Sequence, residues 1–273
     1  MSAQIIKHVT AILEEEPIGC EQELEALAKI KKHDEYTYLH SLNVARLAVN
    51  LGRKLNLSHA KLIELGWAAL LHDLGKLHVP IEVLNKVSKF SPQELEVMQS
   101  HPVESLVAYF KHLAFEIRTF DRLSAAFEHH QRYDLKGYPG VKLKISLHPF
   151  SRIIAICDTF DAMTTDRIYQ RRILPDLALK IMAQGYGTIF DPVVLQAFIT
   201  SLGAFPVGSL VRLNDEALAI VDHYHKGSAL DRPVVKKLPF PGAKEIDLSS
   251  TEFNHLRILR SEFPEDHGIE IRN

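Results

Sequence analysis

Residues 68–80 read AALLHDLGKLHVP, in which an apolar run leads directly into the pair His72-Asp73. The run continues an apolar stripe that recurs at helical spacing from Leu62 onward. This periodicity predicts a helix from about His59 to Leu74, broken at Gly75. Two side chains that can bind a metal therefore lie at the end of a helix that is otherwise typical of a buried core.

A second pair, His129-His130, follows 57 positions after the first, in FEHHQRYDLKGYPG (residues 127–140). Other potential ligands are His40, His101 and Asp158, each in a stretch with helical periodicity. Each has an ordinary interpretation, because a lone histidine on an apolar face is usually a core residue and a histidine pair can stabilise a helix end. The joint pattern favours a metal centre, since imidazole and carboxylate together suit iron, manganese or zinc.

Helical periodicity dominates the chain to about residue 201. Ser91 followed by Pro92 and Glu94 predicts a helix start with a capping box, and Pro102 is expected to kink or restart that helix. The remaining expected helices cover about residues 22–30, 36–55, 121–130, 151–165 and 192–200, and residues 133–140 are expected to form a loop.

After Phe205 the pattern changes. Short strands are predicted at Val207–Arg212, Ala217–Asp222 and Arg232–Leu238, followed by a partly irregular tail. The expected fold is mainly α, with a small β-containing appendage at the C-terminal end. The expected division is an N-terminal helical segment (residues 1–35), a catalytic domain (36–204) and a β-containing extension (205–273).

Composition excludes several classes of protein. Lys plus Arg is 32 and Asp plus Glu is 34, a formal charge of −2, which argues against binding a nucleic-acid polymer through its backbone. Two cysteines cannot form a disulfide framework. The N-terminus turns acidic too early for a signal peptide, and no run of about 18 apolar residues could cross a membrane. The sequence therefore predicts a cytoplasmic protein with no membrane contact.

Four stretches together resemble the HD-GYP group of HD-domain phosphodiesterases, which hydrolyse bacterial cyclic dinucleotides, chiefly cyclic di-GMP. They are the two quoted above, VLNKVSKFSPQELEVMQSHP (residues 83–102) and SRIIAICDTFDAMTTDRIYQ (151–170). The likeness runs from about Tyr36 to Ile199. It implies an HD-domain helical bundle with a GYP loop.

The resemblance also implies two divalent ions, iron or manganese, although zinc binds such sites tightly. One ion would be held by His40, His72, Asp73 and Asp158. The second would be held by His101, His129 and His130, with Asp73 bridging both ions. A subset of the group carries Glu at the position of Tyr36 and holds a third ion, so Tyr36 favours a two-metal site.

Roles beyond the metals follow from the same resemblance. Asp73 and Lys76 are the expected catalytic residues, with Lys76 assisting near the scissile phosphate. The residues expected to bind substrate are Arg132, Asp134, Gly137, Tyr138, Pro139 and Arg167. A metal ion can lower the pKa of bound water from 15.7 to about 7, and Asp73 would hold the resulting hydroxide in line with the departing ribose oxygen. The expected products are linear pGpG, GMP or both.

Three positions depart from the group's pattern. Gln131 replaces a Glu, and Gln170 replaces a second cation that Arg171 and Arg172 could partly supply. Leu135 replaces a Gly, which matters if that position needs a positive φ.

These departures keep alternatives open. One is a catalytically weak or inactive module that binds cyclic dinucleotides, and another is a phosphodiesterase for a different cyclic dinucleotide or for a nucleotide monophosphate ester. A scaffold that contacts a diguanylate cyclase (GGDEF) domain through the GYP loop would need no metal. The sequence also leaves homodimerisation open.

Overall fold

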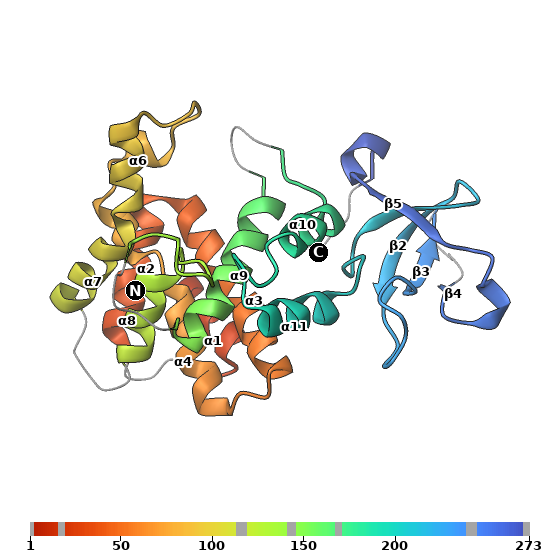
Figure 1. Ribbon diagram of the computed structural model, residues 1–273, viewed down its shortest axis with the longest axis horizontal. Helices are drawn as coiled ribbons and strands as arrows, with labels where there is room; N and C mark the ends of the chain where they lie inside the picture. The colour runs from red at the N-terminus through yellow and green to blue at the C-terminus, as the bar shows by residue number, and fades with distance from the viewer. Residues whose placement is uncertain are drawn as a thin grey trace.

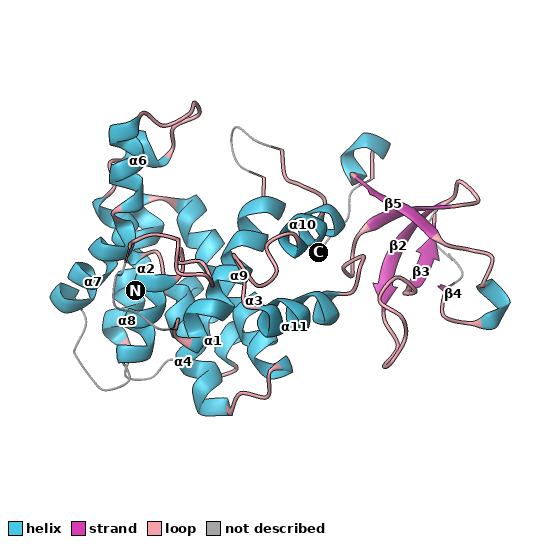
Figure 2. Cartoon of the chain, viewed as in Figure 1, coloured by secondary structure: helices cyan, strands magenta, loops and turns pink. Residues whose placement is uncertain are grey.

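The computed structural model describes residues 3–15, 20–112, 119–140, 146–166, 171–238 and 245–269. They form a helical body that ends at Leu202 and a small antiparallel sheet that begins at Leu210 (Figure 1; Figure 2). This arrangement confirms the predicted fold class of a mainly α protein with a β-containing appendage.

The helices of the body, in chain order, are α1 (Ala3–Leu13), α2 (Glu21–His33), α3 (Glu35–Lys54), α4 (His59–Leu70), the 3-10 helix η1 (Leu74–His78), α5 (Ile81–Leu84), α6 (Pro92–Gln99), α7 (His101–His112), α8 (Thr119–Glu128), α9 (Pro149–Thr164), α10 (Pro175–Ala183) and α11 (Pro192–Leu202). The capping box at Ser91 and the restart of the helix before Pro102 are both as predicted. Helix α10 was not anticipated.

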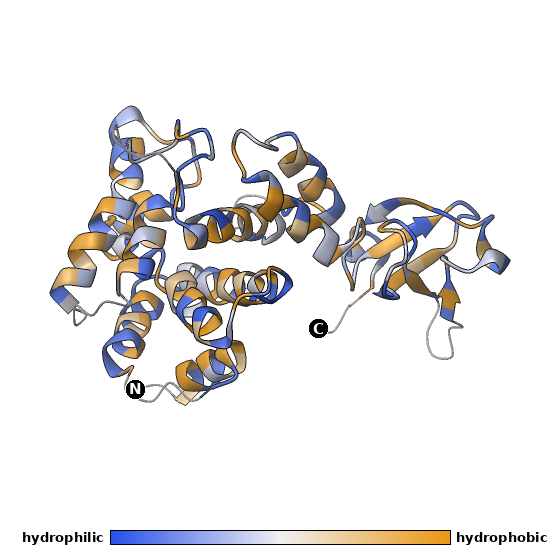
Figure 3. Ribbon diagram, turned by 60° about the horizontal axis from the view of Figure 1, so that its bottom comes forward, coloured by the Kyte–Doolittle hydropathy of each residue, from blue (hydrophilic) through white to orange (hydrophobic). Residues whose placement is uncertain are grey.

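One hydrophobic core runs through the body. It includes Ile5 of α1, Leu27 of α2, Trp67 of α4 and Phe198 of α11, all of them at most 1% exposed. Figure 3 shows apolar residues throughout the helices of the body. Helices α1 and α2 thus contribute to the same core as α3 and α4, and a boundary at residue 35 separates elements that pack together. The division into three domains stays a proposal.

The prediction of one helix from His59 to Leu74 was wrong at its C-terminal end. Helix α4 ends at Leu70, and the tighter turns of η1 begin at Leu74, so Gly75 lies inside η1 and does not end α4. The N–H of Leu74 donates to the carbonyl of Leu71 at 3.1 Å, a three-residue step that replaces the four-residue step of α4. His72 and Asp73 consequently lie in the turn between two helices.

The C-terminal sheet has its own core, formed by residues such as Val211, Val221 and Val235. Its strands are β1 (Leu210–Leu213), β2 (Leu218–His223), β3 (Val234–Lys237), β4 (Glu245–Asp247) and β5 (Ile258–Glu262), accompanied by the 3-10 helices η2 (Thr251–Phe253) and η3 (Pro264–His267). The strand order is β4-β3-β2-β1-β5, and every neighbouring pair is antiparallel.

The three predicted strands are present, and the first begins at Leu210, after a turn in which the N–H of Ser209 donates to the carbonyl of Pro206. The expectation of a partly irregular tail was wrong over β4 and β5. These two are the edge strands of the sheet, and neither alternates clearly between buried and exposed residues, so the sequence gives no period-two signal there.

Within the described residues, no helix combines the length and the apolar character that crossing a bilayer requires.

Candidate metal centre

Five segments bring the predicted ligands together. His40 comes from α3, His72 and Asp73 from the turn before η1, and Asp158 from α9. The others are His101, the first residue of α7, and the pair His129-His130 directly after α8. Apart from Asp158 and His130, which are partly buried, all are at most 4% exposed.

Gly75 explains how the turn reaches α7. A Cβ at this position would lie 2.0 Å from the backbone oxygen of His101 and 2.5 Å from the backbone nitrogen of Ser105. The Gly75 N–H also donates to the Ser105 hydroxyl at 2.8 Å. Only glycine permits this approach, which places Asp73 beside His101.

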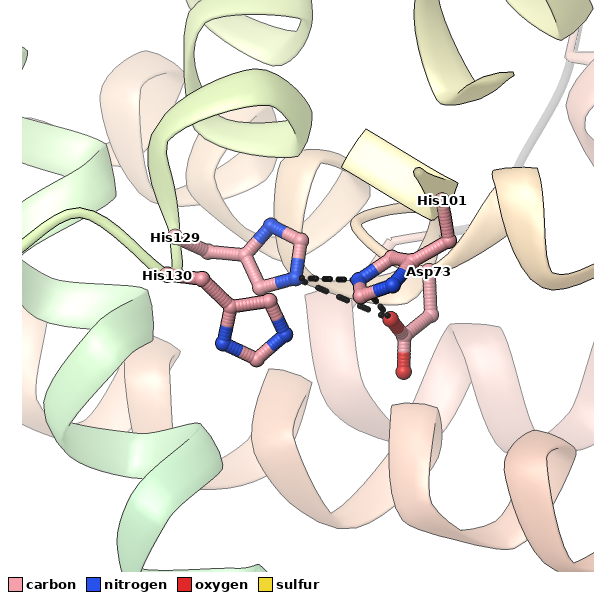
Figure 4. Close-up of side chains that lie close together, drawn as sticks. All are labelled: Asp73, His101, His129 and His130. Atoms are coloured by element: carbon pink, nitrogen blue, oxygen red, sulfur yellow. Dashed lines mark hydrogen bonds and ion pairs between the residues drawn. The ribbon is translucent and has the colours of Figure 1, made fainter. Parts of the chain in front are cut away.

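The first candidate cluster contains Asp73, His101, His129 and His130, whose ligand atoms all lie within 4.8 Å of one another (Figure 4). Asp73 Oδ1 is 3.3 Å from His101 Nε2 and 3.7 Å from His129 Nε2. The two imidazole nitrogens are 3.2 Å apart. Figure 4 shows the rings of His101 and His129 joined to one oxygen of Asp73, with the ring of His130 beside His129.

The second candidate cluster contains His40, His72 and the same Asp73. Its contacts use the other carboxylate oxygen, since Asp73 Oδ2 is 3.3 Å from His72 Nε2 and 3.9 Å from His40 Nε2. Asp73 therefore offers one oxygen to each cluster. This arrangement is the one expected of a carboxylate that bridges two ions.

Asp158 lies between the two clusters. Its Oδ1 is 3.0 Å from His40 Nε2, and its Oδ2 is 3.8 Å from His130 Nδ1. The resemblance to the HD-GYP group implied that Asp158 binds the ion held by His40 and His72. The short contact to His40 fits that assignment, and the longer one places the carboxylate within reach of the other cluster as well.

Three histidines are each oriented by a backbone carbonyl of the helix that precedes them, α4, α6 or α8. In each, Nδ1 donates to the carbonyl three residues earlier, which leaves Nε2 with a lone pair for an ion. These bonds join His72 to Ala69 at 2.7 Å, His101 to Met98 at 2.7 Å and His129 to Ala126 at 2.9 Å.

His40 is oriented by a carboxylate. Its Nδ1 lies 2.6 Å from Asp161 Oδ2, and Asp161 also accepts a hydrogen bond from the Thr165 hydroxyl at 3.1 Å. Such carboxylate–histidine pairs fix the ring and raise its basicity toward a metal. Asp161 was not among the site residues predicted from the sequence. Its spacing of three residues from Asp158 in α9 is the signal that could have indicated it.

Among the buried side-chain atoms of the described residues that have no hydrogen-bond partner, two belong to predicted metal ligands. They are Nε2 of His72 and Oδ1 of Asp73, which belong to different clusters. An unpaired buried polar atom costs free energy unless something satisfies it. Both atoms are metal-donor types, so the residues present fit a pair of divalent ions.

The electrostatics also suit metal binding. Burial lowers the pKa of His101 to about 3 despite the opposing charge of Asp73, and burial likewise lowers the pKa values of His129 and His130. These rings are therefore neutral at pH 7. Burial opposes ionisation of Asp73, but Lys76 and His72 outweigh it and hold the pKa of that carboxyl well below its usual range.

The pKa of His40 shifts in the opposite direction from those of the other three histidines. Burial lowers its pKa, but hydrogen bonds to Asp158 and Asp161 outweigh burial and raise the pKa to about 9. In the absence of metal, His40 is consequently protonated at neutral pH. A metal ion that binds there must displace a proton.

Lys76 lies beside the shared carboxylate, with Nζ 2.5 Å from Asp73 Oδ2. Its side chain is 20% exposed, whereas that of Asp73 is 1% exposed. The ammonium group is therefore positioned between the buried carboxylate and solvent.

The loop after His130 folds back on the cluster. A Cβ at Gly137 would lie 2.3 Å from the backbone oxygen of His130, so this position requires glycine. The side-chain amide of Gln131 donates to the carbonyl of Pro139. Leu135 has a φ of 63°, which confirms that the position where the HD-GYP pattern has Gly uses a positive φ.

Arg132 and Asp134 were both expected to bind substrate. They form a bidentate ion pair with each other, in which Arg132 Nε donates to Asp134 Oδ1 at 3.0 Å and Arg132 Nη2 donates to Asp134 Oδ2 at 2.9 Å. Arg167 and Gln170 lie outside the described residues. Arg171 and Arg172 pair with acidic residues of η3, at Asp266 and Glu265 respectively.

Comparison with known proteins agrees with this geometry. The HD-domain family profile matches residues 19–194, and this chain therefore belongs to the HD-domain family. Its buried His/Asp cluster is able to bind metal.

Two curated relatives are similar at the level of sequence. The cyclic di-GMP phosphodiesterase PA4108 of Pseudomonas aeruginosa is 34% identical over 250 residues, 88% of this chain and 56% of that protein. The 3'3'-cGAMP-specific phosphodiesterase 3 of Vibrio cholerae is 34% identical over 172 residues, 63% of this chain and 36% of that protein. The chain spans about half or less of the length of these relatives.

Among solved structures, Bd1817, a HDG"Y"P protein from Bdellovibrio bacteriovorus, matches with a TM-score of 0.50 and 19% identity, covering 71% of this chain and 68% of its own. That likeness concerns the fold.

Proposed function

We propose that this chain is a metal-dependent phosphodiesterase of the HD-GYP group that hydrolyses a 3′–5′ phosphodiester of cyclic di-GMP, with pGpG, GMP or both as products. The observation that carries the proposal is the sharing of Asp73 between two His/Asp clusters. Two adjacent divalent ions are a standard arrangement for displacement at a phosphodiester. The curated relative named as a cyclic di-GMP phosphodiesterase supports the choice of substrate.

In this proposal His40, His72, Asp73 and Asp158 hold one ion, and His101, His129 and His130 hold the other together with Asp73. Iron or manganese suits this mixture of imidazole and carboxylate. When bound, two such ions would supply an activated water and offset charge on the phosphoryl oxygens. Tyr36 stacks parallel to His40 at 6.3 Å, and a tyrosine there favours two ions over three.

Lys76 would act on the solvent side of the metals. Its ammonium group keeps Asp73 ionised in the buried site and is exposed enough to approach a substrate phosphate. A lysine in this position would also offset charge that develops on the phosphoryl oxygens. The proposed substrate contacts of Arg132, Asp134, Gly137, Tyr138, Pro139 and Arg167 rest on the resemblance to the HD-GYP group.

The direct test is product analysis. Protein purified without oxygen and loaded with iron(II) or manganese(II) is mixed with cyclic di-GMP, and the nucleotides are identified by mass spectrometry. We expect metal-dependent pGpG or GMP, and a loss of at least about 10²-fold in Asp73→Ala, because one electrostatic group at a reaction centre is typically worth that much. Asp215→Ala, a carboxylate that pairs with Lys237 at the sheet, is the matched control.

Intact cyclic di-GMP despite full metal loading would contradict hydrolysis of this substrate and favour a binding module. Full turnover by Asp73→Ala would contradict the assignment of the bridging carboxylate.

A second substrate belongs in the same assay. The relative named as specific for 3'3'-cGAMP is as similar in identity, at 34%, as the cyclic di-GMP phosphodiesterase. Parallel reactions with both cyclic dinucleotides at equal concentration give the ratio of kcat/KM values, which is the measure of specificity. Contact with a GGDEF domain, homodimerisation and a cytoplasmic location remain proposals from the sequence.

A further inference from the structure

His130 differs from the other histidines of its cluster in the way its ring is held. His72, His101 and His129 each use Nδ1 to bond a backbone carbonyl of their own turn. Among the described residues, His130 has no such bond. Its Nδ1 lies 3.8 Å from Asp158 Oδ2, and its side chain is 25% exposed. Something other than its own backbone must orient this ring.

The ring of Tyr138 lies against it. The centroids of the His130 and Tyr138 rings are 4.7 Å apart and the planes differ by 26°, which is a stacked contact. The same tyrosine ring meets His101 edge-on, with centroids 6.4 Å apart and planes at 83°. A flat ring packed in this way restricts the tilt of an imidazole on its face.

The loop holds Tyr138 in that place. The Tyr138 N–H donates to the carbonyl of His130 at 3.3 Å, and Gly137 permits the close approach of the two backbones. On the other side of Tyr138, the Gln131 amide donates to the carbonyl of Pro139. An ionised Glu at position 131 could only accept, so Gln131 supplies a link that the group's usual residue would lack.

We propose that Tyr138 is a positioning residue for the second metal ion, acting by holding the His130 ring toward Asp73, His101 and His129. The inference rests on the proposed dinuclear centre and deepens it. The GYP loop becomes part of the support of a metal ligand, so the conformation of residues 137–139 and the occupancy of this ion are coupled. The coupling is reciprocal, as linkage requires.

The test measures manganese binding, with no substrate present. The full chain is titrated anaerobically with Mn(II), metal per chain is counted after desalting, and the electron paramagnetic resonance spectrum reports whether two ions are coupled. The variants are Tyr138→Phe, which keeps the ring, Tyr138→Ala, and Tyr138→Leu, which keeps apolar bulk without a flat ring. Tyr133→Ala is the control, because Tyr133 lies in the same loop and its N–H, a backbone group that the substitution keeps, donates to the carbonyl of Ile189.

We expect two coupled ions in the wild type, Tyr138→Phe and Tyr133→Ala. In Tyr138→Ala and Tyr138→Leu the second ion should bind about 10–100-fold more weakly, the usual loss when support of a ligand is removed, and the spectrum should change to that of an isolated ion. Wild-type affinity for both ions in Tyr138→Leu or Tyr138→Ala would overturn the role of Tyr138. A wild-type chain that binds a single ion would instead refute the dinuclear centre itself.

Discussion

The interior of the helical body and the junction between that body and the sheet both depend on charged side chains, but they use them differently. In the interior, Asp73 is 1% exposed and His72 is fully buried. At the junction, Arg171 and Asp266 pair at 2.8 Å with side chains 51% and 53% exposed. Charge is costly to bury, so it persists inside only where partners or a metal satisfy it, whereas exposed pairs form at little cost and contribute little.

The junction also has a looser construction than the body. Arg171 stacks on Phe263 at 3.7 Å, and Arg172 pairs with Asp166 and Glu265. Beside these contacts lies a cavity of about 740 Å³ lined by residues of both parts. The sheet and the body have separate hydrophobic cores. Buried contacts in the interior therefore hold the side chains of the candidate metal centre in place. The sheet is attached to the body by exposed contacts, which are easier to weaken.

The largest expected effect comes from breaking a buried ion pair. Arg122 of α8 donates to Glu23 of α2 at 2.7 Å and to Glu64 of α4 at 2.9 Å, with its own side chain 11% exposed. Arg122→Ala leaves two acidic groups unpaired in a partly buried place and should cost about 3–5 kcal/mol of unfolding free energy. Urea denaturation of the wild type and the variant measures this loss of unfolding free energy.

Arg171→Ala is the matched change at the junction and should cost less than about 1 kcal/mol. Equal losses for the two variants would remove the distinction between interior and junction on which the comparison rests.

Next in size is the loss of the carboxylate behind His40. Asp161→Ala removes the 2.6 Å bond to His40 Nδ1 and should weaken binding of the adjacent ion by about 10–100-fold. Anaerobic titration with Mn(II) measures the change. Asp222→Ala provides the control, because Asp222 pairs with His223 at 2.8 Å on the exposed sheet. An unchanged ion affinity in Asp161→Ala would show that the helix packing alone orients His40.

A third effect depends on pH. The pKa of His40 is raised from 6.5 to about 9 in the folded, metal-free chain. Because the folded pKa exceeds the unfolded one, the protonated ring stabilises the fold fully below pH 6.5, and this contribution is lost as pH rises through about 9. The Tm of metal-free protein should therefore fall between pH 6.5 and 9.5. Metal-free His40→Asn should lack this fall, and an identical slope in that variant would assign it to another group.

Sequence alone could predict the residues that gather around Asp73 but not all of their supports. His72-Asp73 and His129-His130 stand out because metal-binding residue types occur in pairs beside glycine-bearing loops. The signal for Asp161 was its three-residue spacing from Asp158, and a carboxylate at that spacing can equally face solvent. Gly75 was read as a helix breaker, while its actual role is a close contact with α7 that no sequence pattern records.

The same limit applies to the sheet. Strands β1, β2 and β3 each contain two or more buried residues, which alternate with partly buried ones in β2, and all three were predicted. Strands β4 and β5 are edges, with only Ile246 and Ser261 buried respectively, so their sequences resemble loops. Their place in the fold is set by pairing with β3 and β1, which is a tertiary effect.

The smallest expected effect concerns the attachment of the sheet. The double change Glu265→Gln and Asp266→Asn keeps shape but removes the charges that pair with Arg171 and Arg172. Global stability should change by less than about 1 kcal/mol, because these pairs are exposed. Hydrogen exchange should nevertheless rise in residues 203–209, which connect the body to the sheet, and stay unchanged in the core of α9.

Wild-type protein in 1 M salt should behave like the variant, since the screening length there is only about 3 Å. If exchange in the connection were insensitive to both changes, the sheet would have to be held by contacts other than these ion pairs, such as the cation–π contact of Arg171 with Phe263, and the junction would resemble the interior after all.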